Sequence, residues 1–259
     1  MQHGILMLAL GLGVGAFGTL IGAGGGFLMM PIFMVIFPDR SADELTAISL
    51  AVIAMNALSG TIAYARKGRV DFHSGTMFAA ASVPGAILGA LTTTTMSREV
   101  FDPIFASLLF IVGLYLFWRP TPKGHSSKAE TAAEFKGDYN RSLGIGLSVG
   151  VGYLSSLLGI GGGIIHVPAM VHLLRFPVHI ATATSHFVLG CMTLVGTLVH
   201  LWNGSLIPGL HEILFLGPGV IVGAQIGAKF STRVHGNWII RALALALASV
   251  GLRLLLKSA

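Results

Sequence analysis

Long apolar runs, separated by short polar turns, make up most of the chain and predict membrane-spanning helices. The first charged side chain is Asp39, and further charge-free runs lie on both sides of a polar stretch at residues 119–141. A helix that crosses a bilayer needs about 20 mostly apolar residues. The pattern predicts full-length helices at residues 46–64, 74–94, 103–118, 181–202, 213–230 and 238–256.

Two further apolar segments are interrupted by glycines in the same way. Residues 20–26 and 157–163 share the pattern L-[IL]-G-[AI]-G-G-G, and Pro31 and Pro168 follow at the same distance. Glycine triplets break a helix, because glycine gains the most conformational freedom when it is released from one. The sequence therefore predicts helical pieces on either side of each break. They are residues 4–21 and 27–37, and residues 142–158 and 164–174.

The two broken segments begin two related halves of the chain. Landmarks recur in the same order in both. They are Ser49 and Ser185, Gly60 and Gly196, Pro84-Gly85 and Pro218-Gly219, and Gly113 and Gly251. An ordered set of this kind indicates an internal duplication. We expect two transmembrane repeats, residues 1–118 and 142–259, joined by a mobile linker at residues 119–141.

The distribution of Lys and Arg favours halves of opposite orientation. Cytoplasmic loops of membrane proteins carry an excess of these residues. The turn at residues 66–69 carries three of them, whereas the matching turn at residues 202–209 carries none. If each broken segment crossed the membrane once, the halves would be parallel. If each is a hairpin that enters and returns, the second half is inverted, and Arg175 and Lys229 become cytoplasmic.

We therefore expect an all-α polytopic membrane protein made of two inverted repeats. Each repeat is a glycine-broken helical hairpin, re-entrant or made of short spans, plus three transmembrane helices. The expected location is the cell inner (plasma) membrane, with the linker in the cytoplasm.

Composition narrows the possible functions. The chain of 259 residues is 54% hydrophobic and 10% charged, whereas soluble domains contain about 25% charged residues. The net charge of +6 fits loop charges that set topology, and nucleic-acid binding is not expected. The only cysteine is Cys191, so no intrachain disulfide or Cys-based metal site can form. Enzyme motifs and paired intramembrane carboxylates are absent, so we expect no enzyme, no metal and no cofactor apart from a coupling ion, H⁺ or Na⁺.

The glycine triplets are the strongest candidates for a binding site. A helix that restarts after a break directs free N–H groups and its positive dipole end toward the break. Such an end attracts anions without a buried lysine or arginine. Close helix packing is the alternative, and it is the favoured explanation for isolated glycines such as Gly11, Gly13, Gly15 and Gly150. A matched pair of glycine-interrupted apolar segments, one in each half, is typical of a transporter binding site.

Polar residues inside the predicted spans extend this candidate site. Ser49 and Asn56 share one helical face, Ser185 and His186 lie at the matching place in the second half, and His166 follows the second triplet. Interhelical hydrogen bonding and direct substrate contact both remain open for them. The candidate substrate-binding residues are Gly24, Gly25, Gly26, Ser49, Asn56, Gly161, Gly162, Gly163, His166, Ser185 and His186.

At the two glycine-to-proline motifs the sequence resembles the TauE/SafE sulfite exporter family, also called the toluene sulfonate uptake permeases. The resemblance covers essentially the whole chain. It implies an inner-membrane permease for small sulfur-containing or carboxylate anions, such as sulfite, sulfonates or sulfoacetate. We expect a secondary transporter that works by alternating access and holds its substrate at the helix N-termini of the breaks. The alternative is an anion channel or receptor-like membrane protein without ion coupling. The expected partners are a small anion and the bilayer, and the oligomeric state stays open, with a homodimer as one option.

Overall fold

The chain folds into a bundle of helices. The computed structural model describes residues 2–118, 131–135, 139–231, 241, 244, 245 and 247–253, and these residues contain helices and no strands. Most of the predicted linker and much of the predicted helix at residues 238–256 lie outside the described residues. The long helices are α1 (Gln2–Ile21), α3 (Ala42–Ala65), α4 (Phe72–Thr93), α5 (Arg98–Trp118), α6 (Arg141–Leu158), α8 (Val178–Trp202) and α9 (Leu210–Phe230). The shorter elements are α2 (Gly26–Ile36), α7 (Gly163–His172) and the 3-10 turns η1 (Ala132–Glu134) and η2 (Ile207–Gly209).

Five helices in the described part of the chain are long and apolar enough to cross a membrane. They are Gly4–Ile21, Ala42–Ala65, Phe72–Thr93, Val178–Trp202 and Ile207–Phe230. Two shorter apolar helices, Gly26–Ile36 and Gly163–His172, follow the glycine breaks as predicted. Their length is too small for a full span, because each residue of a helix adds about 1.5 Å. The prediction of an all-helical polytopic membrane protein is therefore confirmed.

Helix α3 begins four residues earlier than the apolar pattern predicts, at Ala42. The hydroxyl of Ser41 accepts a hydrogen bond from the backbone N–H of Glu44 at 3.1 Å, which caps the helix. Asp43 and Glu44 lie in the first turn, where carboxylates interact favourably with the helix dipole. Polar residues thus belong to the start of this helix, although hydrophobicity alone assigns them to a loop.

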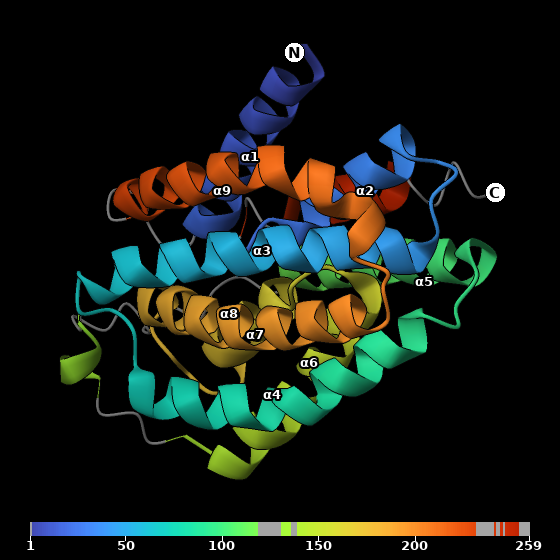
Figure 1. Cartoon of the computed structure of the whole chain (residues 1–259). Helices are drawn as coiled ribbons and strands as arrows, with labels where there is room; N and C mark the ends of the chain where they lie inside the picture. The colour runs from blue at the N-terminus through green and yellow to red at the C-terminus, as the bar shows by residue number, and fades with distance from the viewer. Residues whose placement is uncertain are drawn as a thin grey trace.

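Four of the long helices lie in a row, in the order α9, α3, α8 and α4 (Figure 1). Helix α1 packs along α9, and α6 packs along α4. Each contact therefore has a counterpart in the other half of the chain. Helix α1, the first helix of the first half, packs on α9 of the second half. Helix α6, the first helix of the second half, packs on α4 of the first half.

The packing of α4 and α9 corrects the sequence alignment by one helical turn. Gly85 packs against the backbone of α6 beside Tyr153. Gly223 packs against the backbone of α1 beside Ala16. Ala16 and Tyr153 lie at the same distance before their glycine breaks, so Gly85 corresponds to Gly223. The recurring proline-glycine landmarks pair Gly85 with Gly219 instead. The recurring proline-glycine pair is a sequence landmark, but the contact surface is set by where glycine allows two helices to approach.

The last helices of the two halves also pack reciprocally. Gly113 of α5 lies against the backbone of Ala248, and Gly251 lies against the backbone of Phe110 of α5. These reciprocal contacts are those expected if Gly113 and Gly251 are equivalent.

Helices α3 and α8 meet in the middle of the row and run antiparallel. Gly60, near the end of α3, lies against His186, near the start of α8. Gly196, near the end of α8, lies against Leu50, near the start of α3. The two helices thus run in opposite directions and contact each other around their centres.

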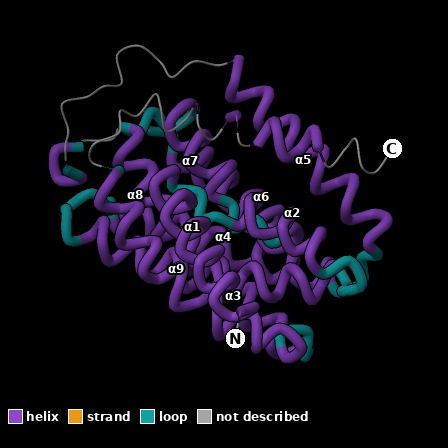
Figure 2. The backbone as a smooth tube through the Cα atoms, turned by 90° about the horizontal axis from the view of Figure 1, so that it is seen from above, coloured by secondary structure: helices purple, strands orange, loops and turns teal. Residues whose placement is uncertain are grey.

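The chain turns back at each glycine break. Helix α1 runs in the direction of α3, because Gly15 lies beside Asn56 and Thr19 contacts Tyr64 further along. Helix α2 runs the opposite way, because its first residue, Gly26, lies against Ile53, while Met30 lies near the start of α3. The first broken segment is therefore a helical hairpin, and the teal loops among α1, α2, α6 and α7 in Figure 2 are the two breaks.

The described part of the linker packs against the bundle. The rings of Phe135 and Tyr139 pack at a tilt against Phe176, with ring centroids 4.5 and 5.0 Å apart. The N–H of Ala132 donates to the carbonyl of Gly68 at 2.8 Å. The expected mobile loop is thus fastened to the protein at its C-terminal end, where aromatic residues give it apolar surface to bury.

Candidate functional site

Three glycines in each break adopt a backbone conformation that other residues avoid. In the first break Gly22, Gly24 and Gly25 have φ angles of 85°, 74° and 87°. Their counterparts Gly159, Gly161 and Gly162 have φ angles of 64°, 79° and 68°. Positive φ costs an L-residue roughly 1–2 kcal/mol because of its Cβ. The first, third and fourth positions of the G-x-G-G-G motif are therefore glycine for backbone reasons.

The fifth position is glycine because the two breaks touch. A Cβ added to Gly163 would lie 2.5 Å from the carbonyl oxygen of Gly22, and one added to Gly26 would lie 2.7 Å from the carbonyl carbon of Ile160. Segments far apart in the sequence thus approach backbone to backbone. The structure brings the two triplets together.

The contact between the breaks lies at the crossing of α3 and α8. Ile53 of α3 and Leu189 of α8 both pack against Gly24, and the same two side chains pack against Gly161. Both residues are buried. The breaks therefore meet at the centre of the antiparallel pair, between the two halves of the chain.

Two helices start at the breaks and aim their N-termini into this centre. Gly25 is the N-cap of α2 and Gly162 is the N-cap of α7, and neither makes a side-chain cap. The carbonyl of Gly25 accepts from Leu28 and Met29, and that of Gly162 accepts from Ile165 and His166. The first N–H groups of a helix have no acceptor within it. The site thus has positive electrostatic character without a charged side chain.

A hydrogen-bonded network fastens the first break to α3 and α8. The side-chain amide of Asn56 donates to the carbonyl of Gly24 at 3.0 Å, and its oxygen accepts from the hydroxyl of Thr19 at 3.2 Å. Nε2 of His186 lies 3.2 Å from that hydroxyl. The hydroxyl of Tyr64 donates to the carbonyl of Thr19 at 2.7 Å. Asn56 and His186 are therefore brought to the break, as predicted, together with two residues that the sequence analysis did not single out.

Ser49 and Ser185 occupy matching positions but make different contacts. Ser49 donates to the carbonyl of Gly159 at 2.6 Å, beside the second break. The hydroxyl of Ser185 is buried and has no hydrogen-bond partner in the described structure. A buried polar atom without a partner is unusual and calls for a bound water, ion or ligand.

Ser185 is one of several such atoms around the breaks. On α8, Thr182 lies against Gly22, and the hydroxyl of Thr182 and Nδ1 of His186 also lack partners in the described structure. Residues three and four apart share a helical face, so these groups lie on one face of α8. Around the second break the unpartnered, buried hydroxyls are those of Thr46, Ser155 and Ser156. We call these six groups the unpartnered set.

Contacts to glycine place three members of the unpartnered set, Thr46, Thr182 and Ser155, at the breaks. Thr46 lies against Gly159 as Thr182 lies against Gly22, and Ser155 lies against Gly162. Thr46 and Thr182 are equivalent by the same spacing as Ser49 and Ser185, which was a usable sequence signal. Sequence cannot, however, reveal whether a buried hydroxyl is already bonded to its own helix. Hydroxyls and an imidazole around two helix N-termini can all donate hydrogen bonds to an anion.

His166 lies apart from this arrangement. Its Nε2 is 3.4 Å from the hydroxyl of Ser148 on α6, and its ring packs edge-on against Phe78 of α4, with centroids 5.7 Å apart. The residue is 2% exposed. Although it belongs to the first turn of α7, its side chain points to the outer helices α4 and α6, whereas His186 points to the first break.

The isolated glycines divide into two groups. Gly11 and Gly15 pack against the backbone of α9 at Leu216 and Val220, as the packing interpretation expects. Gly13 and Gly150 have nothing within 4 Å of an added Cβ. Packing therefore explains only the first pair.

Comparisons with known proteins find similar sequences over nearly the whole chain. The family model described as "Sulfite exporter TauE/SafE" matches residues 7–254. The chain is 32% identical to the probable membrane transporter protein YunE of Bacillus subtilis, over 97% of both chains. It is 25% identical to the probable membrane transporter protein MJ0441 of Methanocaldococcus jannaschii, over 97% of this chain and 95% of that one. A probable membrane transporter protein of Xylella fastidiosa is also 25% identical, over 84% of this chain and 81% of the relative. No solved structure matches the chain.

Proposed function

Because the chain belongs to the sulfite exporter TauE/SafE family, we propose that it is a secondary transporter for a small sulfur-containing or organic anion. The family and its probable membrane transporter relatives favour transport over catalysis. In our proposal, sulfite, a sulfonate or a related anion crosses the plasma membrane, which is the inner membrane of a cell with two membranes. It binds where the two glycine breaks meet.

One observation carries this proposal: buried hydrogen-bond donors without partners surround two helix N-termini. The unpartnered set supplies hydroxyls from α3, α6 and α8 and Nδ1 of His186. The N-termini of α2 and α7 add positive dipole ends. A compact oxyanion has acceptors on several sides and can accept from many of these groups at once. None of the described residues at the breaks is a carboxylate, which would repel an anion.

The close contact between the breaks supports alternating access. In the described state the backbone of Gly163 touches that of Gly22, so an anion between them requires the two halves to separate. Separation on one face at a time would expose the site to one side of the membrane and then to the other. The substrate must therefore bind the separated states better than the closed one.

The positions of the charged turns support inverted repeats. Nζ of Lys67 donates to the carbonyl of Ala228 at 2.5 Å, so the C-terminal end of α9 lies beside the turn at residues 66–69. Burial lowers the pKa of Lys67, and the charges of Arg69 and Lys229 lower it further. An inverted second half has Lys229 on the same side as this turn, whereas a parallel one has it on the opposite side. The antiparallel crossing of α3 and α8 supports the same arrangement.

The test is a binding screen followed by a flux assay. Thermal unfolding of the purified protein is measured with sulfite, sulfate, thiosulfate, sulfonates and short carboxylates. A ligand at 100 times its dissociation constant stabilises the folded state by about 2.7 kcal/mol. Flux of the best anion is then measured in proteoliposomes. Saturable flux is expected, whereas stabilisation by none of the anions, or flux that never saturates, would contradict the proposal.

Ser185→Ala and Thr193→Val form a matched pair for locating the site. Both hydroxyls are buried in α8, but that of Thr193 donates to the carbonyl of Leu189 in its own helix at 2.7 Å. We expect Ser185→Ala to weaken stabilisation by the anion and Thr193→Val to leave it unchanged. Equal effects of both would place the anion elsewhere.

A further inference from the structure

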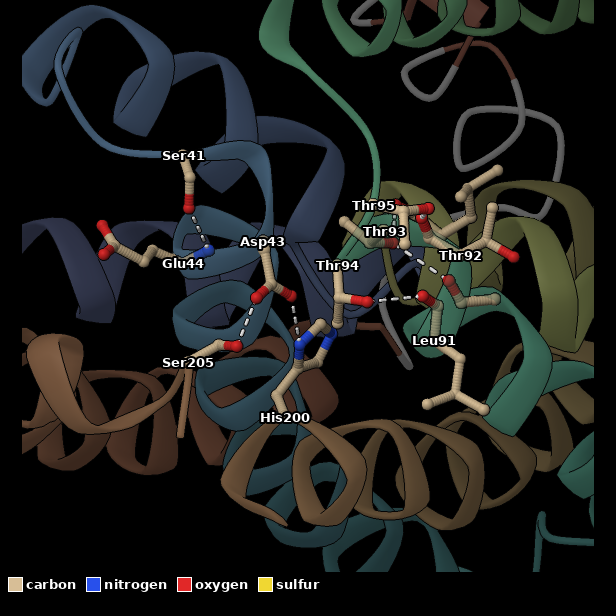
Figure 3. A network of polar contacts seen from close by, with 12 residues as sticks. Ser41, Asp43, Glu44, Leu91, Thr92, Thr93, Thr94, Thr95, His200 and Ser205 are labelled. Atoms are coloured by element: carbon tan, nitrogen blue, oxygen red, sulfur yellow. Dashed lines mark hydrogen bonds and ion pairs between the residues drawn. The ribbon is translucent and has the colours of Figure 1, made fainter. Parts of the chain in front are cut away.

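A second cluster of buried polar groups joins the start of α3 to the end of α8 (Figure 3). Nδ1 of His200 lies 2.7 Å from Oδ1 of Asp43, and the hydroxyl of Ser205 donates to the other carboxylate oxygen of Asp43. The side chain of His200 is fully buried, whereas that of Asp43 is 17% exposed. Nε2 of His200 has no hydrogen-bond partner in the described structure.

The helix ends favour opposite charges on the two residues. Asp43 lies in the first turn of α3, where the helix dipole stabilises an anion, and His200 lies in the last turn of α8, where it stabilises a cation. A protonated imidazole beside the carboxylate forms an ion pair, and the buried pair remains neutral overall. When the proton leaves, the carboxylate loses its counter-charge.

Most of the polar side chains that surround the pair in Figure 3 carry no charge. Ser205 is uncharged, and the threonines at the end of α4, including Thr94, are close by in Figure 3 and cannot titrate. Their hydroxyls bond the carbonyls of their own helix end. Other charged groups of this end include Glu44, whose side chain points away in Figure 3, Asp39 and Glu99, and the pairs Arg40–Glu212 at 2.6 Å and Arg98–Asp102 at 2.9 Å.

The cluster is one helical turn from the second break on both helices. Thr46, one turn after Asp43, lies against Gly159. Gly196, one turn before His200, lies against Ser156, with an added Cβ 3.0 Å from its hydroxyl oxygen. A change in the Asp43–His200 contact therefore acts on the segments that hold this break.

At the opposite end of the α3–α8 pair the place of His200 is taken by Tyr64, whose ring packs edge-on against His186 with centroids 5.6 Å apart. Tyr64 follows Gly60 as His200 follows Gly196, and its hydroxyl donates to the carbonyl of Thr19 at 2.7 Å. At this end the imidazole of His186 lies beside neutral hydroxyls, whereas at the other end the imidazole of His200 lies beside a carboxylate. The two ends of the crossing thus differ in chemistry although their backbones correspond.

We propose that the Asp43–His200 pair is the binding site for the coupling proton, and that protonation of His200 closes this end of the α3–α8 crossing. Loss of the proton releases the end and lets the second break open toward it. The proton enters from solution past the partly exposed carboxylate of Asp43. The coupling role rests on the proposed function, whereas proton binding does not.

Proton binding is tested by nitrogen NMR of the protein labelled with ¹⁵N-histidine, between pH 5 and 8. A titrating imidazole signal is expected in the wild type and should be missing in His200→Gln, which keeps a donor to Asp43 but cannot titrate. His211→Gln is the matched control, because His211 is an exposed histidine at the start of α9. The signal should persist in that variant. If no titrating signal disappears with His200, the pair is not a proton site.

Coupling is tested with sulfite in proteoliposomes. A gradient of one pH unit supports about tenfold accumulation for each coupled proton. Wild type and His211→Gln should show pH-driven accumulation, and His200→Gln and Asp43→Asn should lose it while still exchanging sulfite across the membrane. Equal pH-driven accumulation in all variants would overturn the coupling role. If wild type moves none of the screened anions, the proposed function fails, and the NMR result still decides whether the pair binds a proton.

Discussion

At the first break Asn56 donates to the Gly24 carbonyl and accepts from Thr19, whereas at the second break the position of Asn56 is taken by Met192, whose methyl group packs against Gly162. The glycines of the two breaks have similar φ angles and similar contacts. Backbone geometry has thus been retained in both halves while the surrounding side chains differ. The difference indicates that the glycines make the shared hairpin, and that the polar residues make each half distinct.

The largest effect is expected from filling the breaks. Gly25→Leu and Gly162→Leu each force a branched side chain into positive φ, with added Cβ atoms 2.6 Å from Val14 and 2.5 Å from Met192. Both variants should insert in the membrane and lose at least about 99% of anion flux, because strain of roughly 1–3 kcal/mol adds to the steric clash. Flux in proteoliposomes measures this, with Gly150→Leu as the control at an open position. Full flux in either break variant would show that the two breaks are not both required.

The next prediction compares the side chains that hold each break in place. Asn56→Leu leaves the carbonyl of Gly24 and the hydroxyl of Thr19 without this partner, and should lower the free energy of unfolding by about 1–3 kcal/mol. Met192→Leu, the counterpart change, exchanges side chains of similar volume and should cost less than about 1.5 kcal/mol. Denaturant unfolding in detergent compares them. Equal losses would mean that the network around Asn56 adds no more than apolar packing does.

A smaller effect distinguishes the equivalent serines. Ser49→Ala removes a hydrogen bond to Gly159 and should cost about 1 kcal/mol of stability. Ser185→Ala removes a hydroxyl without a partner and should leave stability within about 0.5 kcal/mol, while anion affinity falls up to about tenfold. Unfolding of both variants with and without the anion provides all four values. A stability loss for Ser185→Ala equal to that of Ser49→Ala would show that its hydroxyl is bonded within the protein.

The sequence predicted the breaks and the helices around them better than it predicted which residues contact one another. The breaks, the hairpins and the reciprocal landmarks follow from glycine patterns, because positive φ and backbone contact leave few alternatives to glycine. The pairing of Gly85 with Gly219 was wrong by a turn, because the recurring prolines do not mark the surfaces that pack. Thr46 and Thr182 were missed, because a buried threonine in a helix usually bonds its own backbone, and only the structure shows that these two do not.

The smallest expected effect concerns glycines that neither turn the chain nor touch another helix. Gly13 of α1 and Gly150 of α6 occupy matching places and have open space around an added Cβ. Alanine is favoured over glycine inside a helix by up to about 1 kcal/mol. Gly13→Ala and Gly150→Ala should therefore raise the unfolding temperature slightly and leave transport unchanged. Gly11→Ala, two residues from Gly13, should lower it, because its Cβ would lie 2.5 Å from the carbonyl oxygen of Leu216. If Gly13→Ala or Gly150→Ala reduced flux at unchanged stability, the freedom of the helix next to that break would itself be part of the transport cycle.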